Sequence, residues 1–162
     1  MRKTIMIDLA QIRHLMIDPA QIRRNVNAMD SGTEPLIYML EMHELAMRST
    51  KQIKSPKDFY VYVLLDPRKP GNIKYGEYLF EFEPFYVGLG KGNRWKSHFQ
   101  CKEGITNKNV LVWEIVLSGS PYSVRFVYES KCATAVKEKE AEIIRTIGIA
   151  SRNEGPLLNA KE

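Results

Sequence analysis

The chain has 162 residues, of which 44% are hydrophobic, 27% charged and 10% aromatic. This length fits one domain of ordinary size with a short appendage, and the composition excludes the disordered, collagen-like and low-complexity classes of protein. The formal net charge is +5, and the stretch from Gly88 to Lys102 holds four Lys and Arg residues and no acidic one. The basic excess is therefore local, and it favours a polyanionic partner.

The sequence carries no signal for a membrane span or for export. No apolar run approaches the roughly 18 residues that cross a bilayer, and the basic N-terminus reaches Asp8 before a sustained apolar region forms. We therefore expect no signal peptide. Cys101 and Cys132 lie far apart in the sequence, so we expect free thiols in the reducing cytoplasm rather than a disulfide.

Residues 1–55 are expected to form a helical extension that precedes the main domain. Residues 6–15 and 16–25 are near-identical tandem copies, and two copies of ten residues are too few for a solenoid. A local duplication, or a start codon placed upstream of a true start at Met16, explains them. Asp18-Pro19 predicts a helix start inside the second copy, and Ser55-Pro56 marks the boundary to the main domain.

The next segment predicts a hairpin of two strands. Phe59 to Leu65 is β-branched and aromatic, which is typical of a strand buried on both faces. Asp66 to Gly71 has the residue types of a turn, and Pro84 to Gly88 is expected to form the partner strand across a long hairpin loop.

Helices and one further strand are expected after the hairpin. Asn93 can cap a helix that runs to about Lys102, and the later elements are a helix over 107–117, a strand over 122–128 and an amphipathic helix over 131–148 that ends at Gly148. An extended tail over 155–159 follows. The expected fold is a small mixed α/β domain whose mainly antiparallel three-stranded sheet is flanked by helices.

Glu140 is chemically costly where the pattern places it. It lies within the apolar stripe of the last helix, which Ala133, Val136, Ile144 and similar residues form. A carboxylate in such a stripe must be paired or hold a metal ion. A salt bridge to an Arg and a metal site are the two interpretations.

Arg94 and His98 are spaced four residues apart, so an α-helix would present them on one face. A guanidinium beside an imidazole suits a phosphate group, and Gly90-Lys91-Gly92 directly precedes this helix. A solvated basic helix face is the alternative interpretation. Five of the eight tyrosines also lie between Tyr60 and Tyr86, which alone is a weak signal.

Together these residues resemble the GIY-YIG nuclease family over residues 58–160. The first family motif stands here as Tyr60-Val61-Tyr62 and the second as Tyr86-Val87-Gly88. The Arg-x-x-x-His helix matches Arg94 and His98, and the remaining family positions match Glu140 and Asn159. The residues in and around both motifs look most like those of one branch of the family, which includes phage endonucleases and the nuclease domain attached to LEM-domain and ankyrin-repeat proteins. Leu89 stands where this branch often has Lys, and Tyr60 replaces the usual Gly.

The resemblance implies hydrolysis of a DNA phosphodiester with one divalent metal ion, Mg²⁺ or Mn²⁺. Glu140 would hold the metal, Arg94 would neutralise charge on the phosphate, and Tyr62 would accept the proton of the attacking water. Because a free tyrosine has a pKa of about 10, that role needs a lowered pKa, for which Lys91 and His98 are candidates. Tyr86 would position the water or the phosphate, and Asn159 would hold the geometry. The expected DNA contacts are Lys91, Arg94, Lys96, Lys102 and Lys108.

Target choice is expected to come from outside the core, from residues 1–50 or from the loop Arg68–Glu83. No zinc finger or helix-turn-helix is apparent, so we expect weak sequence specificity or recognition of DNA structure, in a bacterial or phage-infected cell. Cutting both strands would need a homodimer or sequential nicking. A catalytically silent DNA-binding module of the same fold is the alternative function.

Overall fold

The elements of the main domain follow one another in the predicted order. A computed structural model of the chain describes residues 48, 50, 52–99, 106–120 and 123–159. The described elements are β1 (Phe59–Tyr75), β2 (Tyr78–Lys91), the 3-10 helix η1 (Arg94–Phe99), α4 (Asn107–Leu117), β3 (Ser123–Ser130), α5 (Ala133–Ile147) and the 3-10 helix η2 (Ala150–Arg152). The predicted mixed α/β fold is therefore confirmed. The predicted helical extension and its tandem repeat lie almost wholly outside the described residues.

The three strands form one antiparallel sheet in the order β2-β1-β3. As the central strand, β1 is covered on both faces, and all six residues from Tyr60 to Leu65 are at most 2% exposed. This agrees with the prediction of a strand buried on both sides, and it explains the run of apolar and aromatic residues without polar alternation.

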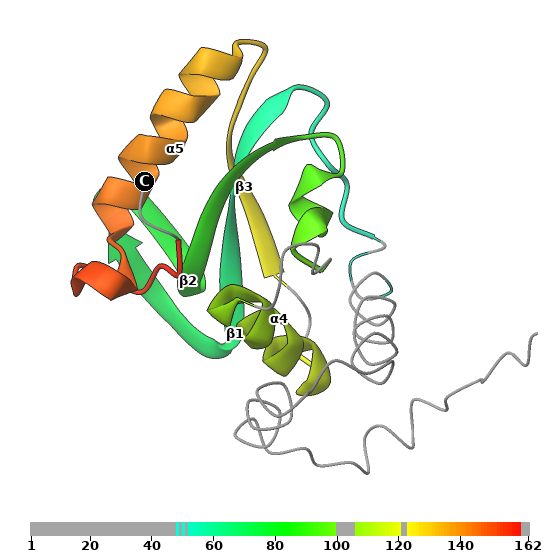
Figure 1. Cartoon of the computed structure of the whole chain (residues 1–162), viewed down its shortest axis with the longest axis vertical. Helices are drawn as coiled ribbons and strands as arrows, with labels where there is room; N and C mark the ends of the chain where they lie inside the picture. Colours follow the sequence, from blue (N-terminus) through cyan, green and yellow to red (C-terminus); the bar gives the residue numbers. More distant parts are fainter. Residues whose placement is uncertain (1–47, 49, 51, 100–105, 121–122, 160–162) are drawn as a thin grey trace, which may run out of the picture.

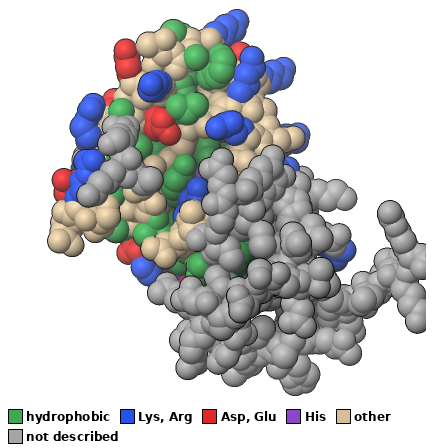
Figure 2. Space-filling model, in the orientation of Figure 1, with side chains coloured by type: hydrophobic (Ala, Val, Ile, Leu, Met, Phe, Trp, Pro, Cys, Tyr) green, Lys and Arg blue, Asp and Glu red, His purple; other side chains and the backbone are tan. Residues whose placement is uncertain are grey.

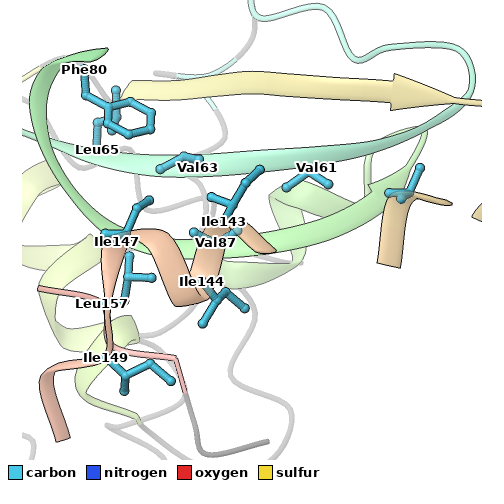
Figure 3. Packing of buried hydrophobic residues seen from close by; sticks show 11 residues of the cluster. Val61, Val63, Leu65, Phe80, Val87, Ile143, Ile144, Ile147, Ile149 and Leu157 are labelled. Atoms are coloured by element: carbon cyan, nitrogen blue, oxygen red, sulfur yellow. The ribbon is translucent and has the colours of Figure 1, made fainter. Parts of the chain in front are cut away.

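Each face of the sheet packs against a separate layer of helix (Figure 1). Val61, Val63 and Leu65 point to one side and meet Ile143 and Ile147 of α5 (Figure 3). Tyr60, Tyr62 and Leu64 point to the other side, where η1 and α4 contribute buried side chains such as Trp95 and Val112. The period-2 alternation of β1 therefore divides its side chains between two apolar cores.

The predicted turn at Asp66–Gly71 is wrong, because the two strands continue through it. β1 extends to Tyr75, and the chain reverses at Gly76, whose φ of 56° suits glycine. Register shifts between Asp66 and Pro70, and again between Pro70 and Ile73, absorb the prolines as bulges. The segment Arg68–Glu83, expected to be a loop for target choice, is thus mostly paired strand.

The helix after Asn93 is a 3-10 helix over Arg94–Phe99, whereas we expected an α-helix with Arg94 and His98 on one face. At three residues per turn, two positions four apart point roughly 120° away from each other. The exposures agree, because Arg94 is exposed and His98 is only 7% exposed. Residues 100–105 lie outside the described part.

The last helix ends as predicted, with Gly148 as its C-cap residue. Val136, Ile143, Ile144 and Ile147 are buried, whereas Ala133, which we placed in the same stripe, is exposed. Among the described residues, no helix is both long and apolar enough to span a membrane.

A bulge in β2 directs two aromatic side chains to the same core. The register shifts after Leu64, so that Leu64 pairs with Tyr86 and Leu65 with Pro84, and Phe85 is the extra residue. Both Phe85 and Tyr86 pack against the core that η1 and α4 cover. Tyr86 lies on this face by the ordinary alternation of the strand, because it pairs with Leu64 of the same core, and the bulge adds Phe85 beside it.

A buried ion network joins the bulged part of β1 to α4. Arg68 donates from Nε and Nη2 to the Asp66 carboxylate at 2.9 Å each, and its Nη1 lies 3.6 Å from Glu114 Oε2. Asp66 is 1% exposed and Glu114 7%. Burial opposes ionisation of Asp66, but the hydrogen bonds from Arg68 outweigh it and leave the pKa of Asp66 below its ordinary value. Arg68 therefore lies between two buried acidic side chains and holds the pKa of Asp66 down.

Arg68→Met is expected to lower the free energy of unfolding at pH 7 by about 3 kcal/mol, because two buried carboxylates lose their cation. Without the guanidinium, burial is opposed only by the amide of residue 68 and by Lys69, so the pKa of Asp66 rises above its wild-type value and protonation costs the folded variant less. The stability difference from the wild type should consequently narrow as the pH falls from 7 to 4. Urea unfolding across this pH range measures both effects.

Arg125→Met is the matched control, because Arg125 pairs with Glu81 at the surface, where both side chains are about half exposed. We expect a loss of less than about 1 kcal/mol with no marked dependence on pH. Equal losses in the two variants would contradict the role given to the buried network.

Candidate active site

Two tyrosines of β1 lie across two glycines of β2. Tyr62 pairs with Gly88 and Tyr60 with Gly90 in the antiparallel register. A Cβ atom at Gly88 would lie 2.6 Å from the Tyr62 hydroxyl oxygen, and one at Gly90 would lie 2.9 Å from that of Tyr60. Such contacts are too short for any side chain, so the tyrosine rings occupy the space that the glycines leave. The first and second predicted motifs are thus one packed unit.

The Tyr62 hydroxyl is hydrogen bonded to Nε2 of His98. Tyr62 is 2% exposed and His98 7%, so this pair lies beneath the surface. Burial, together with the positive charges of Lys108 and Arg94, lowers the pKa of His98 to about 3. The imidazole is therefore neutral at physiological pH and can either donate to or accept from the phenol.

Tyr86 lies between groups of opposite charge. Its ring meets the His98 imidazole edge to face, with 4.7 Å between centroids, and Lys108 Nζ lies 4.3 Å from the centroid of the Tyr86 ring. Burial and the negative charge of Glu140 raise the pKa of Tyr86, while Arg94 acts in the opposite direction. Tyr86 consequently keeps its proton at neutral pH and can donate a hydrogen bond.

A pocket of about 480 Å³ opens at the edge of β2, where both helical layers meet. Its walls come from Tyr86 of β2, the first residues of α4, two residues of α5 and the C-terminal tail, and the lining residues are Tyr86, Thr106, Asn107, Lys108, Glu140, Ile144, Leu158 and Asn159. Four residues predicted from the sequence as site or DNA contacts are among them, which are Tyr86, Lys108, Glu140 and Asn159. Segments far apart in the chain thus meet in one hollow.

Glu140 presents the pocket with a half-buried carboxylate at the middle of α5. No group of three or more His, Cys, Asp and Glu side chains gathers in the described part of the chain. Mg²⁺ and Mn²⁺ accept carboxylate and water oxygens, and Mg²⁺ needs only one or two carboxylates. The donor set of the pocket therefore fits a hard divalent cation that keeps most of its waters.

Asn159 holds the tail against β2 beside Tyr86. Its side-chain oxygen accepts from the Val87 amide at 3.0 Å, and its side-chain nitrogen donates to the Val87 carbonyl at 2.8 Å. The Leu158 amide also donates to the Phe85 carbonyl at 2.7 Å. This side chain imitates the pairing of a neighbouring strand along the edge of β2, which fits the predicted structural role.

Several other predicted site residues in the described part of the chain do not line the pocket, which are Tyr62, Lys91, Arg94, Lys96 and His98. Arg94 is exposed and influences the pKa of both Tyr86 and His98. Lys91 lies over the ring of Phe59 and Lys96 over that of Trp95, and Lys102 falls outside the described residues. Lys and Arg side chains are spread over the face drawn in Figure 2, with acidic side chains among them.

Sequence reasoning missed the part that the start of α4 plays in the pocket. Thr106 is the N-cap of α4 and forms a capping box with Asn109, and Thr106, Asn107 and Lys108 form one wall. The Thr-x-x-Asn spacing was a readable signal for this helix start. The signal gave no hint that the start of α4 would face Glu140, because that meeting depends on tertiary packing.

Comparison of the chain with family models, with curated proteins and with solved structures gives no match. What the pocket can do has to follow from its own residues.

Gly88→Ala is expected to move Tyr62, because the added methyl group would overlap its hydroxyl. Overpacking of this kind lowers the free energy of unfolding by about 1–3 kcal/mol, and it should break the hydrogen bond to His98. Urea unfolding gives the first effect, and the ring-nitrogen NMR signals of His98 give the second. Gly71→Ala is the control, since a Cβ atom there meets only ordinary contacts at 3.4 Å or more. Unchanged His98 signals in Gly88→Ala would contradict this packing.

The low pKa of His98 predicts a specific loss of stability in acid. The unfolded chain binds a proton at His98 below about pH 6.5, whereas the folded chain does so only near pH 3. The contribution of His98 to stability is therefore complete above pH 6.5 and decreases by about 1.4 kcal/mol for each unit below it. His98→Gln lacks this group, so its free energy of unfolding should fall less between pH 7 and 5. Parallel curves for the two proteins would contradict the prediction.

Proposed function

We propose that the chain is a metal-dependent DNA endonuclease of the GIY-YIG type, which hydrolyses phosphodiester bonds. The observation that carries the proposal is the meeting of Tyr86, Lys108, Glu140 and Asn159 at one pocket, with His98 directly beside Tyr86. A basic group, an acidic group and a protonated phenol at one hollow are the components that phosphoryl chemistry requires.

Lys108 and Arg94 both supply positive charge near Tyr86. A phosphate bound at the mouth of the pocket would meet Lys108 from the wall and Arg94 from the exposed end of η1. A guanidinium can hold two phosphate oxygens at once and stabilise the charge that grows on them during attack. Tyr86 keeps its proton, so it would donate a hydrogen bond to the phosphate or to the attacking water.

Tyr62 and His98 would act as one proton acceptor. The neutral imidazole is hydrogen bonded to the Tyr62 hydroxyl, so it can take the phenol proton while the phenol oxygen takes a proton from water. Such a relay removes the need for a free tyrosinate, which would otherwise be scarce near pH 7 because the ordinary pKa of tyrosine is about 10.

Glu140 would hold the divalent metal ion, Mg²⁺ or Mn²⁺. When bound, the ion would polarise the phosphate and stabilise the departing oxygen. The chain itself contributes one half-buried carboxylate at the pocket wall and, opposite it, the start of α4. Asn159 keeps the β2 edge and the tail in register, so that Tyr86 and Glu140 hold their relative positions.

The wider basic surface suits the DNA backbone rather than particular bases. Lys91 ends β2, Arg94 and Lys96 lie on η1, and Lys108 lies on the first turn of α4. Contacts of this kind position DNA without reading its sequence. Because the segment Arg68–Glu83 is paired strand, weak sequence specificity or recognition of DNA structure remains the proposal. Double-strand cleavage would require a homodimer or two successive nicks.

Cleavage of supercoiled plasmid tests the proposed function. The wild type should nick or linearise plasmid with Mg²⁺ or Mn²⁺ and should be inactive with EDTA. Glu140→Ala should lower the cleavage rate at least 100-fold while DNA binding is retained, because the metal ligand is lost but the basic surface is not. Arg94→Lys should also slow cleavage, since a point charge replaces the two-pronged donor.

Glu138→Gln is the matched control, because Glu138 is an exposed carboxylate on the same helix. It should cleave plasmid at the wild-type rate. DNA binding without any cleavage, tested also on branched and single-stranded DNA, would favour the silent DNA-binding module instead.

A further inference from the structure

A buried asparagine of α4 holds the backbone of His98. Asn109 is 5% exposed, and its side-chain nitrogen donates to the His98 carbonyl at 2.9 Å. This contact links α4 to the end of η1, eleven residues earlier in the chain.

The same side chain also organises the start of α4. The side-chain oxygen of Asn109 accepts from the backbone amide of Thr106 at 3.1 Å and from the Thr106 hydroxyl at 2.5 Å. The backbone amide of Asn109 donates to the Thr106 hydroxyl at 3.3 Å. The capping box needs only an acceptor at Asn109, for which an acidic side chain is the usual choice. The side-chain nitrogen of Asn109 is not needed for the cap, and it donates to the His98 carbonyl instead.

We propose that Asn109 is a positioning residue that keeps the imidazole of His98 against the hydroxyl of Tyr62. The inference rests on the proposed function, in which that pair accepts the proton of the attacking water. Asn109 is not among the residues that line the pocket, and it acts through the His98 backbone.

The need for such a residue follows from the helix that carries His98. A 3-10 helix of six residues has poor internal hydrogen-bond geometry, so its last turn depends on outside contacts. Asn109 of α4 holds the backbone carbonyl of His98, and the imidazole of His98 is hydrogen bonded to the Tyr62 hydroxyl. A shift of about 1 Å in a catalytic group can cost about 100-fold in rate, so a backbone anchor at this position has a functional consequence.

Asn109→Asp separates the two duties of the side chain, because a carboxylate keeps the acceptor for the cap and loses the donor to His98. We expect kcat for plasmid cleavage to fall about 10- to 100-fold, with less than a twofold change in KM for DNA. Asn109→Ala is measured beside it, since Ala removes the donor without placing a charge near the carbonyl. Both assays are run at a temperature where circular dichroism shows the variant to be folded.

Glu114→Gln is the matched control, because it weakens the docking of the far end of α4 through Arg68 and leaves Asn109 intact. It should lower Tm while kcat stays at the wild-type value. A loss of kcat in Glu114→Gln equal to that in the Asn109 variants at equal loss of Tm would overturn the positioning role and leave only a stabilising one.

Nitrogen NMR of the imidazoles provides a readout that does not depend on cleavage. The chain has three histidines, and His98→Gln identifies the signals of His98. The Asn109 variants should lose the Nε2 shift that marks the bond to Tyr62, whereas Glu114→Gln should retain it. Wild-type signals in both Asn109 variants would overturn the proposal. Absence of cleavage by the wild type would instead overturn the proposed function, and the NMR result would still decide the role of Asn109.

Discussion

The close approach of the Tyr62 ring to Gly88 is the constraint on which the rest of the site depends. A ring can lie across the neighbouring strand only where that strand has no side chain, and the antiparallel register places glycine at that point. The Tyr62 hydroxyl thereby reaches across β2 to η1, where it is hydrogen bonded to His98. Because the ring has almost no free space, the position of η1 and the position of β2 are fixed against the same atoms. Any change of register between β1 and β2 would separate the phenol from the imidazole.

The pocket follows from where the two layers end. α5 covers one face of the sheet, η1 and α4 cover the other, and residues of α4 and α5 line one pocket beyond the edge of β2. There Glu140 from one layer and Lys108 from the other approach Tyr86 without passing through the sheet. The tail closes this edge through Asn159, which occupies the place that a fourth strand would take. The edge of β2 is therefore already paired at Phe85 and Val87, which opposes strand addition at that point.

Sequence patterns predicted the elements well where side-chain periodicity decides them. The buried strand at Phe59–Leu65, the cap at Gly148 and the order of elements follow from alternation, spacing and turn chemistry. Prediction was wrong at Asp66–Gly71, where two prolines and a glycine are typical of a turn but the buried pair of Asp66 and Arg68 keeps the strand in the sheet. It was also wrong about the helix type at Arg94, because Tyr60 fixes that turn from below: its hydroxyl donates to the Gly92 carbonyl at 2.6 Å. Glu140 was readable as costly in its helix, and the spacing of Arg94 and His98 suggested a phosphate site, whereas Tyr62 and Tyr86 were singled out only by the family resemblance. The contact of Asn109 with His98 was not readable, since it is set by tertiary packing alone.

On the proposed function, the positive charges that attract DNA also lower the pKa of His98 in the free protein, which makes its imidazole a weaker proton acceptor. Burial is the largest cause of the low pKa of His98, and Lys108 and Arg94 lower it further. A phosphate group at the pocket would offset both cations, so this part of the depression would be relieved only while DNA is bound. The imidazole would then become a better acceptor for the Tyr62 proton at the moment when a phosphodiester is present. A site built in this way needs no separate switch, because the substrate itself supplies the charge that completes the proton relay.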